Sequence, residues 1–404
     1  MAKPKLALIP SGYSDGKIYS ILPSNGDGDF TTTRASSATR INSDGFIENV
    51  ATGIPRLDYP LIDGVVSGCP SLLLEPQRTN LIPYSEDFSN AAWIKQNVNL
   101  TSNYEVSPSG NLSADRIITT NTGVDLYQNL SVTANTTYKL SFYVKLRNGE
   151  NLQARFYDLT NALNISYVNY SSQLSNDEWK RVEVEVTTPS GCVSLRFWLT
   201  HNSSSLVDAS FWGAQLEAGT YATSYIPTEG TSITRLADTA NSSGNADTFN
   251  DSEGVLMTEI SALANDSYRF ISLSDGTNSN NVRFNLSPTQ NQISFEVNSG
   301  GSLQSAYTEN NTDVLLNTKL CIKYKQNDFS IYINGFKVHT DSSGLNPIGL
   351  NRINFDRGTG GNPFYGKTKQ LQYFNTILTD IEIEELTSWS SFLEMANGQQ
   401  YSII

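Results

Sequence analysis

Apolar and polar residues alternate along the middle of the chain. Between 138 and 147 the apolar side chains are separated by Lys, Ser, Tyr and Arg, and between 181 and 186 valines alternate with Arg and Glu. A period of two is typical of a β-strand with one buried face. Pro189-Ser190-Gly191 turns the chain toward a further candidate strand at 192–199, and 210–217 supplies a last one. Strands at this spacing, joined by polar loops, predict a jelly-roll sandwich over residues 81–233.

A second series of apolar segments follows the connector at 222–239. The segments that we expect to form successive strands are 255–260, 268–273, 282–286, 293–297, 319–325 and 329–333. Asn334-Gly335 favours a type I′ hairpin turn, because both residues readily take positive φ. These features predict a second sandwich over residues 240–388.

One helix is expected near the end of the chain. Thr379 and Glu382 fit a capping box, in which the threonine oxygen and the glutamate satisfy exposed amides of the first turn. Ile381, Ile383 and Leu386 are then expected to face inward. Whether 388–396 forms a second helix within the C-terminal tail, 389–404, stays open.

Residues 1–80 differ from the rest of the chain. They carry Gly, Pro, Asp and Ser throughout, with no sustained periodicity and only short apolar pieces, and Asp44-Gly45 predicts a tight turn. We expect this segment to wrap on a neighbouring chain or a larger assembly; an extension packed on its own first sandwich is an equal alternative. The expected fold is therefore all-β: two tandem β-sandwich (jelly-roll) domains after an irregular N-terminal assembly segment.

Composition narrows the classes of partner. The formal net charge is −13 without a basic cluster, which argues against nucleic acid, because that affinity comes from Lys and Arg neutralising phosphates. Cys69, Cys192 and Cys321 are far apart and indicate neither a zinc site nor a disulfide framework. The start has too short an apolar stretch for a signal peptide, and no long apolar run predicts membrane insertion. The chain thus has the polar, β-rich composition of an exported protein without an export signal or a disulfide framework. A component of a virus particle that is assembled in bacterial cytoplasm and released by lysis would have these properties.

No catalytic arrangement is apparent. A glycoside hydrolase needs two carboxylates facing one sugar, and the E-x-D-x-x-E run of jelly-roll glucanases does not occur. Glu183 and Glu185 share a strand face opposite the valines and are expected to be solvated. His201 and His339 are far apart, with no nucleophile partner, and are expected in loops. We therefore expect a protein that is not an enzyme.

Two kinds of ligand site are considered. No cofactor is expected, although a structural calcium ion stays open, with Asp247, Asp251, Glu253 and Asp356 as oxygen ligands that lack a diagnostic spacing. The aromatic residues could form a stacking platform for sugars. Trp198 and Trp212 are favoured as core residues. The candidate glycan-binding residues are Tyr157, Tyr167 and Tyr170, in a stretch that reads as rich in loops.

Several segments resemble known families. Asn334-Gly335, 366–375 and 378–386 resemble the concanavalin A-like/laminin G-like superfamily, in which a final strand leads into a short helix. Residues 80–89, with Trp93, and 213–228 resemble the opening and close of carbohydrate-binding-module jelly rolls and are also similar to segments of bacteriophage virion proteins. The segments 34–59 and 69–80 are similar to the same phage proteins.

The resemblance implies a non-enzymatic structural component of a bacteriophage virion, such as a head or tail fibre, a capsid decoration or an appendage. The implied partners are capsid, portal or tail subunits, further copies of this chain in a homotrimer, and host-surface glycans used for host attachment. The implied location is the virion, assembled in the host cytoplasm. A polysaccharide depolymerase and a purely structural spacer are the alternative functions.

Overall fold

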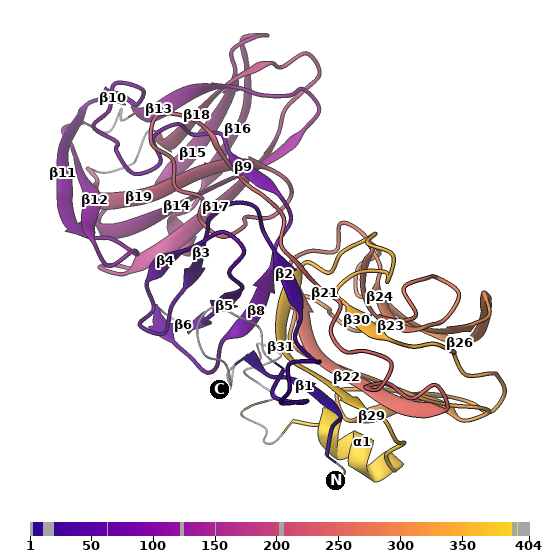
Figure 1. The fold of residues 1–404 in the computed structure, drawn as a ribbon. Helices are drawn as coiled ribbons and strands as arrows, with labels where there is room; N and C mark the ends of the chain where they lie inside the picture. The colour runs from indigo at the N-terminus through magenta and orange to yellow at the C-terminus, as the bar shows by residue number, and fades with distance from the viewer. Residues whose placement is uncertain are drawn as a thin grey trace.

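The computed structural model describes residues 3–10, 20–62, 64–121, 125–149, 151–201, 206–389 and 394. These residues form an almost entirely β protein in which two sandwiches make separate lobes, with strands of the N-terminal segment between them (Figure 1). This confirms the predicted fold class. None of the helices within the described part of the chain is long and apolar enough to cross a membrane.

The first sandwich consists of two five-stranded antiparallel sheets. The front sheet has the order β10 (Ile94–Gln96), β13 (Asp125–Ser131), β18 (Ser194–His201), β15 (Gln153–Asp158) and β16 (Leu163–Asn169). The back sheet has the order β11 (Val98–Val106), β12 (Leu112–Thr119), β19 (Asp208–Ala218), β14 (Thr137–Asn148) and β17 (Trp179–Thr187). A short 3-10 helix, Ser171–Gln173, precedes β17. The alternating residues 138–146 and 182–186 do form half-buried strands, as predicted, and Phe142 and Val184 lie in the core between the sheets.

The second sandwich packs an eight-stranded sheet against a five-stranded one. The large sheet has the order β29 (Phe336–Asp341), β28 (Phe329–Ile333), β27 (Thr318–Lys325), β22 (Glu253–Ala262), β31 (Gly366–Phe374), β8 (Ser71–Leu74) and β5 (Arg56–Asp58), and β1 (Leu6–Leu8) also pairs with β31. The small sheet has the order β26 (Ser302–Glu309), β25 (Ile293–Ser299), β24 (Asn281–Leu286), β23 (Arg269–Ser274) and β30 (Arg352–Asn354).

The N-terminal residues therefore belong to the second sandwich. Leu6, Leu8, Leu72 and Leu74 lie in the core that the large sheet shares with the small one. The described strands of residues 1–80 therefore need no neighbouring chain to bury these leucines, because β31 offers its free edge to β1 and β8. The alternative, in which this segment packs only on the first sandwich, does not account for the pairing of β1 and β8 with β31. Whether the segment anchors the protein in a larger assembly stays a prediction.

The first sandwich is an insertion within the second. The chain leaves β8, enters the first sandwich through β9 (Arg78–Asn80) and returns through β20 (Ile233–Arg235), and these two strands pair antiparallel. A second pair, β2 (Thr31–Thr33) with β21 (Thr239–Asn241), lies beside this crossing. The remaining two-stranded sheets are the hairpins β3 (Ala38–Ile41) with β4 (Ile47–Val50) and β6 (Leu61–Ile62) with β7 (Val65–Val66).

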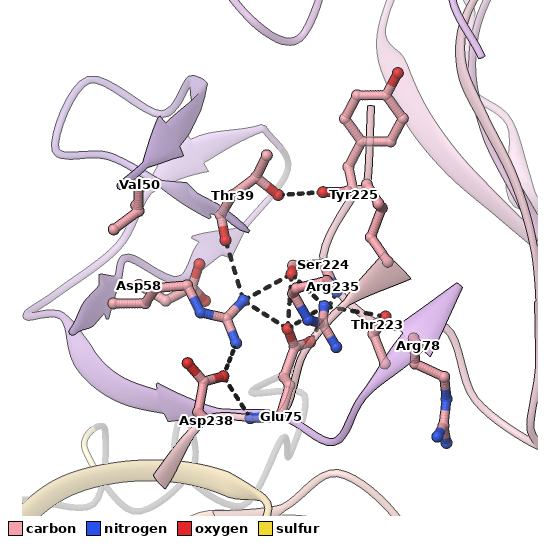
Figure 2. A network of polar contacts seen from close by, with 12 residues as sticks. Thr39, Val50, Asp58, Glu75, Arg78, Thr223, Ser224, Tyr225, Arg235 and Asp238 are labelled. Atoms are coloured by element: carbon pink, nitrogen blue, oxygen red, sulfur yellow. Dashed lines mark hydrogen bonds and ion pairs between the residues drawn. The ribbon is translucent and has the colours of Figure 1, made fainter. Parts of the chain in front are cut away.

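A buried cluster of charged side chains joins the N-terminal strands to the connector (Figure 2). Glu75, just after β8, accepts hydrogen bonds from Arg56 Nη1 at 2.6 Å and from the amide and hydroxyl of Ser224. It also forms an ion pair with Arg235 Nη1 at 2.6 Å. Asp238 pairs with Arg56 and, at 2.9 Å, with Arg34. We call Arg34, Arg56, Glu75, Arg235 and Asp238 the buried ionic cluster.

Opposite charges keep Glu75 and Arg56 of this cluster charged although both side chains are buried. Burial alone would raise the pKa of the Glu75 carboxyl, but Arg235, Arg56 and the Ser224 hydrogen bonds outweigh it and hold that pKa well below its usual range. Burial opposes the charge of Arg56, yet Glu75 and Asp238 raise its pKa. The segment before the first sandwich and the segment after it are thus fastened together by ion pairs in low dielectric.

The β3–β4 hairpin covers the outer face of the back sheet. Ile47 of the hairpin packs with Ala114, Trp212 and Tyr225 in a small buried cluster. The Trp212 indole donates to Glu86 at 3.0 Å, and the Thr39 hydroxyl donates to the Tyr225 carbonyl at 2.5 Å. This contact fixes the N-terminal segment on the first sandwich as well as on the second.

Two features predicted near the end of the second sandwich are present in the structure. Asn334 and Gly335 have φ values of 48° and 88° and join β28 to β29, which confirms the predicted hairpin turn. Thr379 and Glu382 form the predicted capping box of α1 (Asp380–Thr387). Ile383 is buried under the large sheet, whereas Ile381 is 68% exposed, so its expected inward direction is wrong. The possible second helix over 388–396 lies mostly outside the described residues, so that prediction is not tested.

Candidate functional site

Strand register places aromatic and arginine side chains in two rows across the outer face of the front sheet. The first row crosses all five strands and consists of Ile94, Tyr127, Trp198, Arg155 and Tyr167. The second row lies beside it and consists of Asn129, Arg196, Tyr157 and Asn164. Because neighbours on adjacent strands in register point to the same face, these residues form one continuous surface. We call it the front-sheet face.

Two arginines on this face lie over aromatic rings. The Arg155 guanidinium carbon is 4.6 Å from the centroid of Trp198 and 5.1 Å from that of Tyr167. The Arg196 guanidinium carbon is 4.4 Å from the Tyr127 ring and 5.6 Å from Trp198. Trp198 is therefore contacted by both cations, which accounts for its exposure of only 3% although it lies on the outer face. Cation–π attraction holds both guanidinium groups in place.

Asparagine side chains fix the orientation of the arginines. Arg155 Nε donates to Asn164 Oδ1 at 3.1 Å, and Arg196 Nε donates to Asn129 Oδ1 at 2.8 Å. Within the described residues neither arginine forms an ion pair with a carboxylate. Each guanidinium thus has one edge bound by an amide, one face on an aromatic ring, and a positive charge that no acidic side chain of the described chain neutralises.

The rows end at a histidine. His201, the last residue of β18, is paired with Asp125 at 2.5 Å between Nδ1 and Oδ1. Its ring lies 5.7 Å from Tyr167 and 5.4 Å from Trp198, and its Nε2 is 3.4 Å from Arg155 Nη1. The predicted loop position of His201 is wrong, because it lies on a strand, nearly buried, where it supports the end of the face.

The three candidate tyrosines divide into two groups. Tyr157 and Tyr167 lie on the front-sheet face, half-buried and 50% exposed respectively, and on strands instead of the expected loops. Tyr170 is fully buried, and its hydroxyl donates to the Leu199 carbonyl at 2.8 Å. Tyr170 packs edge-on against Phe142 in the core, so it cannot contact a ligand on the surface and is not a site residue.

The other aromatic candidates and His339 are structural. Trp93 packs against Phe197 in the core of the first sandwich, and Trp212 lies under the β3–β4 hairpin. Trp198 is buried as expected, but by the arginines on the outer face and not by the core. His339 lies on β29, stacked on Tyr307 at 5.0 Å, and not in a loop.

The acidic candidates are not gathered at one point. Glu183 and Glu185 are exposed on β17, as predicted. Asp251 accepts the amides of Gly349 and Leu350, Glu253 pairs with Lys325, and the buried Asp356 accepts the Gly358 amide. Among the described residues no group of three or more His, Cys, Asp or Glu side chains could hold a metal ion. A structural calcium ion stays a prediction.

A polar pocket lies where the β3–β4 hairpin meets both sandwiches. It has a volume of about 280 Å³ and is lined by side chains that include Arg40, Asp58, Tyr143, Arg181 and Lys367. Its cations are engaged within the chain, because Lys367 pairs with Asp58 at 2.9 Å, Arg40 pairs with Glu48, and Arg181 donates to the Thr223 carbonyl. On the front-sheet face, in contrast, two cations and several aromatic rings lie together without an acidic partner among the described residues.

Family models match both sandwiches separately. Residues 81–205 match the model described as "Carbohydrate binding domain", and residues 258–384 match the model described as "Concanavalin A-like lectin/glucanases superfamily". The chain therefore contains a carbohydrate-binding-module domain, which bears the front-sheet face, and a concanavalin A-like/laminin G-like domain. No curated protein matches the chain.

The solved structures that match parts of the chain are distant from it in sequence. The Ruminococcus gnavus IT-sialidase CBM40 bound to alpha2,3 sialyllactose is 13% identical, with 37% of this chain and 94% of that chain covered and a TM-score of 0.31. The CBM22-1-CBM22-2 tandem domain of Paenibacillus barcinonensis Xyn10C is 11% identical, covering 73% and 97%, with a TM-score of 0.28. Mouse laminin alpha1 domains LG4-5 are 8% identical, covering 63% and 88%, with a TM-score of 0.24.

Proposed function

We propose that this chain is a non-enzymatic structural component of a bacteriophage virion, a head or tail fibre, decoration or appendage, that binds host-surface glycans through its front-sheet face. The observation that carries the glycan part is the row Tyr127, Trp198, Arg155 and Tyr167, which crosses the sheet on the outside of a carbohydrate-binding-module domain. The half-exposed ring of Tyr167 and the partly exposed rings of Tyr127 and Tyr157, beside amide and guanidinium donors, provide both the stacking and the hydrogen bonds that sugars require, while Trp198 supports the arginines from below.

The arrangement of carboxylates near the front-sheet face supports binding without hydrolysis. A glycosidase places two of them about 5–9.5 Å apart across the sugar. Asp125 is the carboxylate at the edge of the two rows, and His201 already binds it. This arrangement supports the proposal that the face holds a glycan without cleaving it.

The virion part rests on sequence resemblance. Residues 34–59, 69–80 and 213–228 are similar to segments of phage virion proteins. The proposed partners are capsid, portal or tail subunits and two further copies of this chain, and the proposed location is the virion. Several copies held on one particle would make weak sugar contacts useful, because linked sites gain avidity by roughly 10²–10⁴.

The glycan function is tested by binding the purified chain to an array of bacterial surface polysaccharides. We expect retention that weakens about tenfold in Tyr167→Ala, since stacking of one ring contributes roughly 0.5–1.5 kcal/mol beyond burial. Release of reducing sugar from a bound polysaccharide would instead favour the depolymerase. Failure to bind any glycan, with intact folding, would leave the structural spacer as the function.

The virion function is tested by electron cryomicroscopy of purified particles. We expect density for this chain at defined positions, with the first sandwich projecting so that its front sheet is accessible. Particles that lack the chain entirely would overturn the virion proposal while leaving glycan binding to be judged by the array.

A further inference from the structure

We infer that the front-sheet face selects anionic saccharides, sugars that carry a carboxylate or a sulfate group, with Arg155 and Arg196 as the residues that bind the anion. This inference rests on the proposed glycan-binding function and specifies its ligand class. It follows from three properties of the face: its charge, the fixed orientation of its arginines, and the rings and amides around them.

The charge of the face is opposite to that of the whole molecule. The chain has a formal net charge of −13, yet the two rows carry Arg155 and Arg196 and no carboxylate, and Asp125 at their edge is paired with His201. The back sheet shows the usual arrangement, because Arg116 and Arg147 both contact Asp208 there. Two cations without an acidic partner on an acidic protein indicate that the neutralising charge comes from a ligand.

The arginines are held so that they can bind an anion through a planar edge. Their Nε atoms are fixed by Asn164 and Asn129, and their faces rest on Trp198 and Tyr127. The Nη groups of Arg196 make no hydrogen bond to the described residues. A guanidinium with its orientation already fixed loses little entropy on binding, and its fork matches the two oxygens of a carboxylate or a sulfate.

The surroundings of the arginines favour a sugar over other anions. Tyr167 is half exposed beside Arg155, and Tyr157 lies between Arg196 and Asn164 in the second row. A pyranose ring can stack on a tyrosine while its acidic group reaches the adjacent guanidinium, and the asparagine amides can bind its hydroxyls. A simple inorganic anion or an acidic peptide would use the charge but not the rings.

The ligand class is tested with four polymers and the whole chain. Alginate supplies carboxylated sugars, dextran sulfate supplies sulfated sugars, dextran is the neutral counterpart of the latter, and polyglutamate is an anion without sugar. We expect alginate or dextran sulfate to bind at least about tenfold more tightly than dextran and polyglutamate at low salt, because a hydrogen bond to a charged group contributes roughly 1.5–3 kcal/mol. The tighter of the two acidic polymers identifies carboxylate or sulfate as the anion.

Matched variants assign the effect to the two arginines. Arg155→Gln with Arg196→Gln should lose this preference, while Arg357→Gln should bind like the wild type, because Arg357 is also exposed and stacked on a ring, Phe270, but lies in the second sandwich. Arg155→Lys with Arg196→Lys keeps the aliphatic stems over Trp198 and the charges but loses the planar fork, so it should stay folded and still bind more weakly.

Each outcome has a separate meaning. Equal binding of dextran and the acidic polymers, or an unchanged preference in the double variants, would overturn the anionic ligand class and leave glycan binding in place. Polyglutamate binding as tightly as alginate would overturn the selection of a sugar. If neither these polymers nor the polysaccharide array binds the folded wild type, the proposed function itself fails.

Discussion

Arg56 and Glu75 form an ion pair of 2.6 Å in which the side chains are 0% and 3% exposed, at the point where the N-terminal strands meet the connector. Replacing one member of such a pair leaves its partner charged in low dielectric, which costs about 3–5 kcal/mol. We therefore expect Glu75→Gln to lower the free energy of unfolding in urea at pH 7 by that amount. Glu48→Gln breaks the exposed pair with Arg40 and should cost under about 1 kcal/mol. Equal small losses would contradict the role of the buried ionic cluster.

Acid should weaken the same contact. The pKa of Glu75 is lower in the folded chain than the roughly 4.3 of an unfolded one, so its stabilisation is present above that value and is lost as pH falls toward the folded pKa. We expect the unfolding free energy of the wild type to decrease below about pH 4 more steeply than that of Glu75→Gln. Parallel curves for the two proteins would exclude the carboxylate of Glu75 as the titrating group.

Asp115 should have the opposite pH dependence. Its buried carboxylate accepts the amides of Phe88 and Asn103, and burial raises its pKa to about 6. A raised folded pKa stabilises the protein fully below the unfolded value near 3.9, and this is lost as pH rises through about 6. Between these pH values the wild type should lose on the order of 2 kcal/mol relative to Asp115→Asn, measured by urea unfolding. A difference between the two proteins that does not change with pH would show that folding does not raise the pKa of Asp115.

Substitutions of Tyr167 and Tyr170 should affect glycan binding and stability separately. Tyr170→Phe removes the hydrogen bond to the Leu199 carbonyl inside the core and should cost about 1 kcal/mol of stability with no change in glycan affinity. Tyr167→Ala should do the reverse, because Tyr167 lies half exposed on the front-sheet face. Thermal unfolding and polysaccharide binding on both variants check this, and loss of binding in Tyr170→Phe would return Tyr170 to the site.

The hairpin turn of the second sandwich should depend on its glycine. Gly335 has φ of 88°, and a Cβ there would lie 3.1 Å from Cβ of Ser388, so Gly335→Ala should destabilise the chain by about 1–2 kcal/mol. Gly361→Ala is the matched control, because no described atom lies within 4 Å of the added carbon and its φ is not positive. Equal melting temperatures for the two variants would contradict the strain at Gly335.

Local pattern predicted strands better than it predicted their partners. The alternation around Phe142 and the Asn334-Gly335 turn were sufficient because both are set by adjacent residues. The pairing of β1 and β8 with β31 depends on an edge formed far along the chain, and no local period encodes it. Neither of the two expected positions of the N-terminal segment, on a neighbouring chain or on the first sandwich, included this pairing with the second sandwich.

The front-sheet face was only partly predictable. Tyr157 and Tyr167 were singled out, but Arg155 and Arg196 were not, although Arg155 and Tyr157 alternate with the core residues Ala154 and Phe156 and so belong to the outer face. Trp198 stands in the run Phe197 to Leu199, where consecutive apolar residues hide which one points outward. A register irregularity between Leu126 and Tyr127 on the partner strand further disguises the row.

The insertion also governs which pieces of the chain can fold alone. Residues 77–235 contain the whole first sandwich and both strands of the β9–β20 pair, so we expect them to unfold cooperatively as a monomer. Residues 240–389 lack β1, β5 and β8, which leaves the edge of β31 unpaired, so this fragment should aggregate. Urea unfolding and light scattering check both, and a stable monomeric 240–389 would contradict the contribution of the N-terminal strands.

Pairing of β1 with β31 also sets an order of events during synthesis. β1 is synthesised before the first sandwich, and its partner strand β31 is synthesised after it. The first sandwich is complete long before that and can fold while the early strands wait, since domains fold as units as they emerge. Closing the second sandwich therefore requires β31, and a product truncated before Gly366 would retain a folded first sandwich beside an incomplete second one.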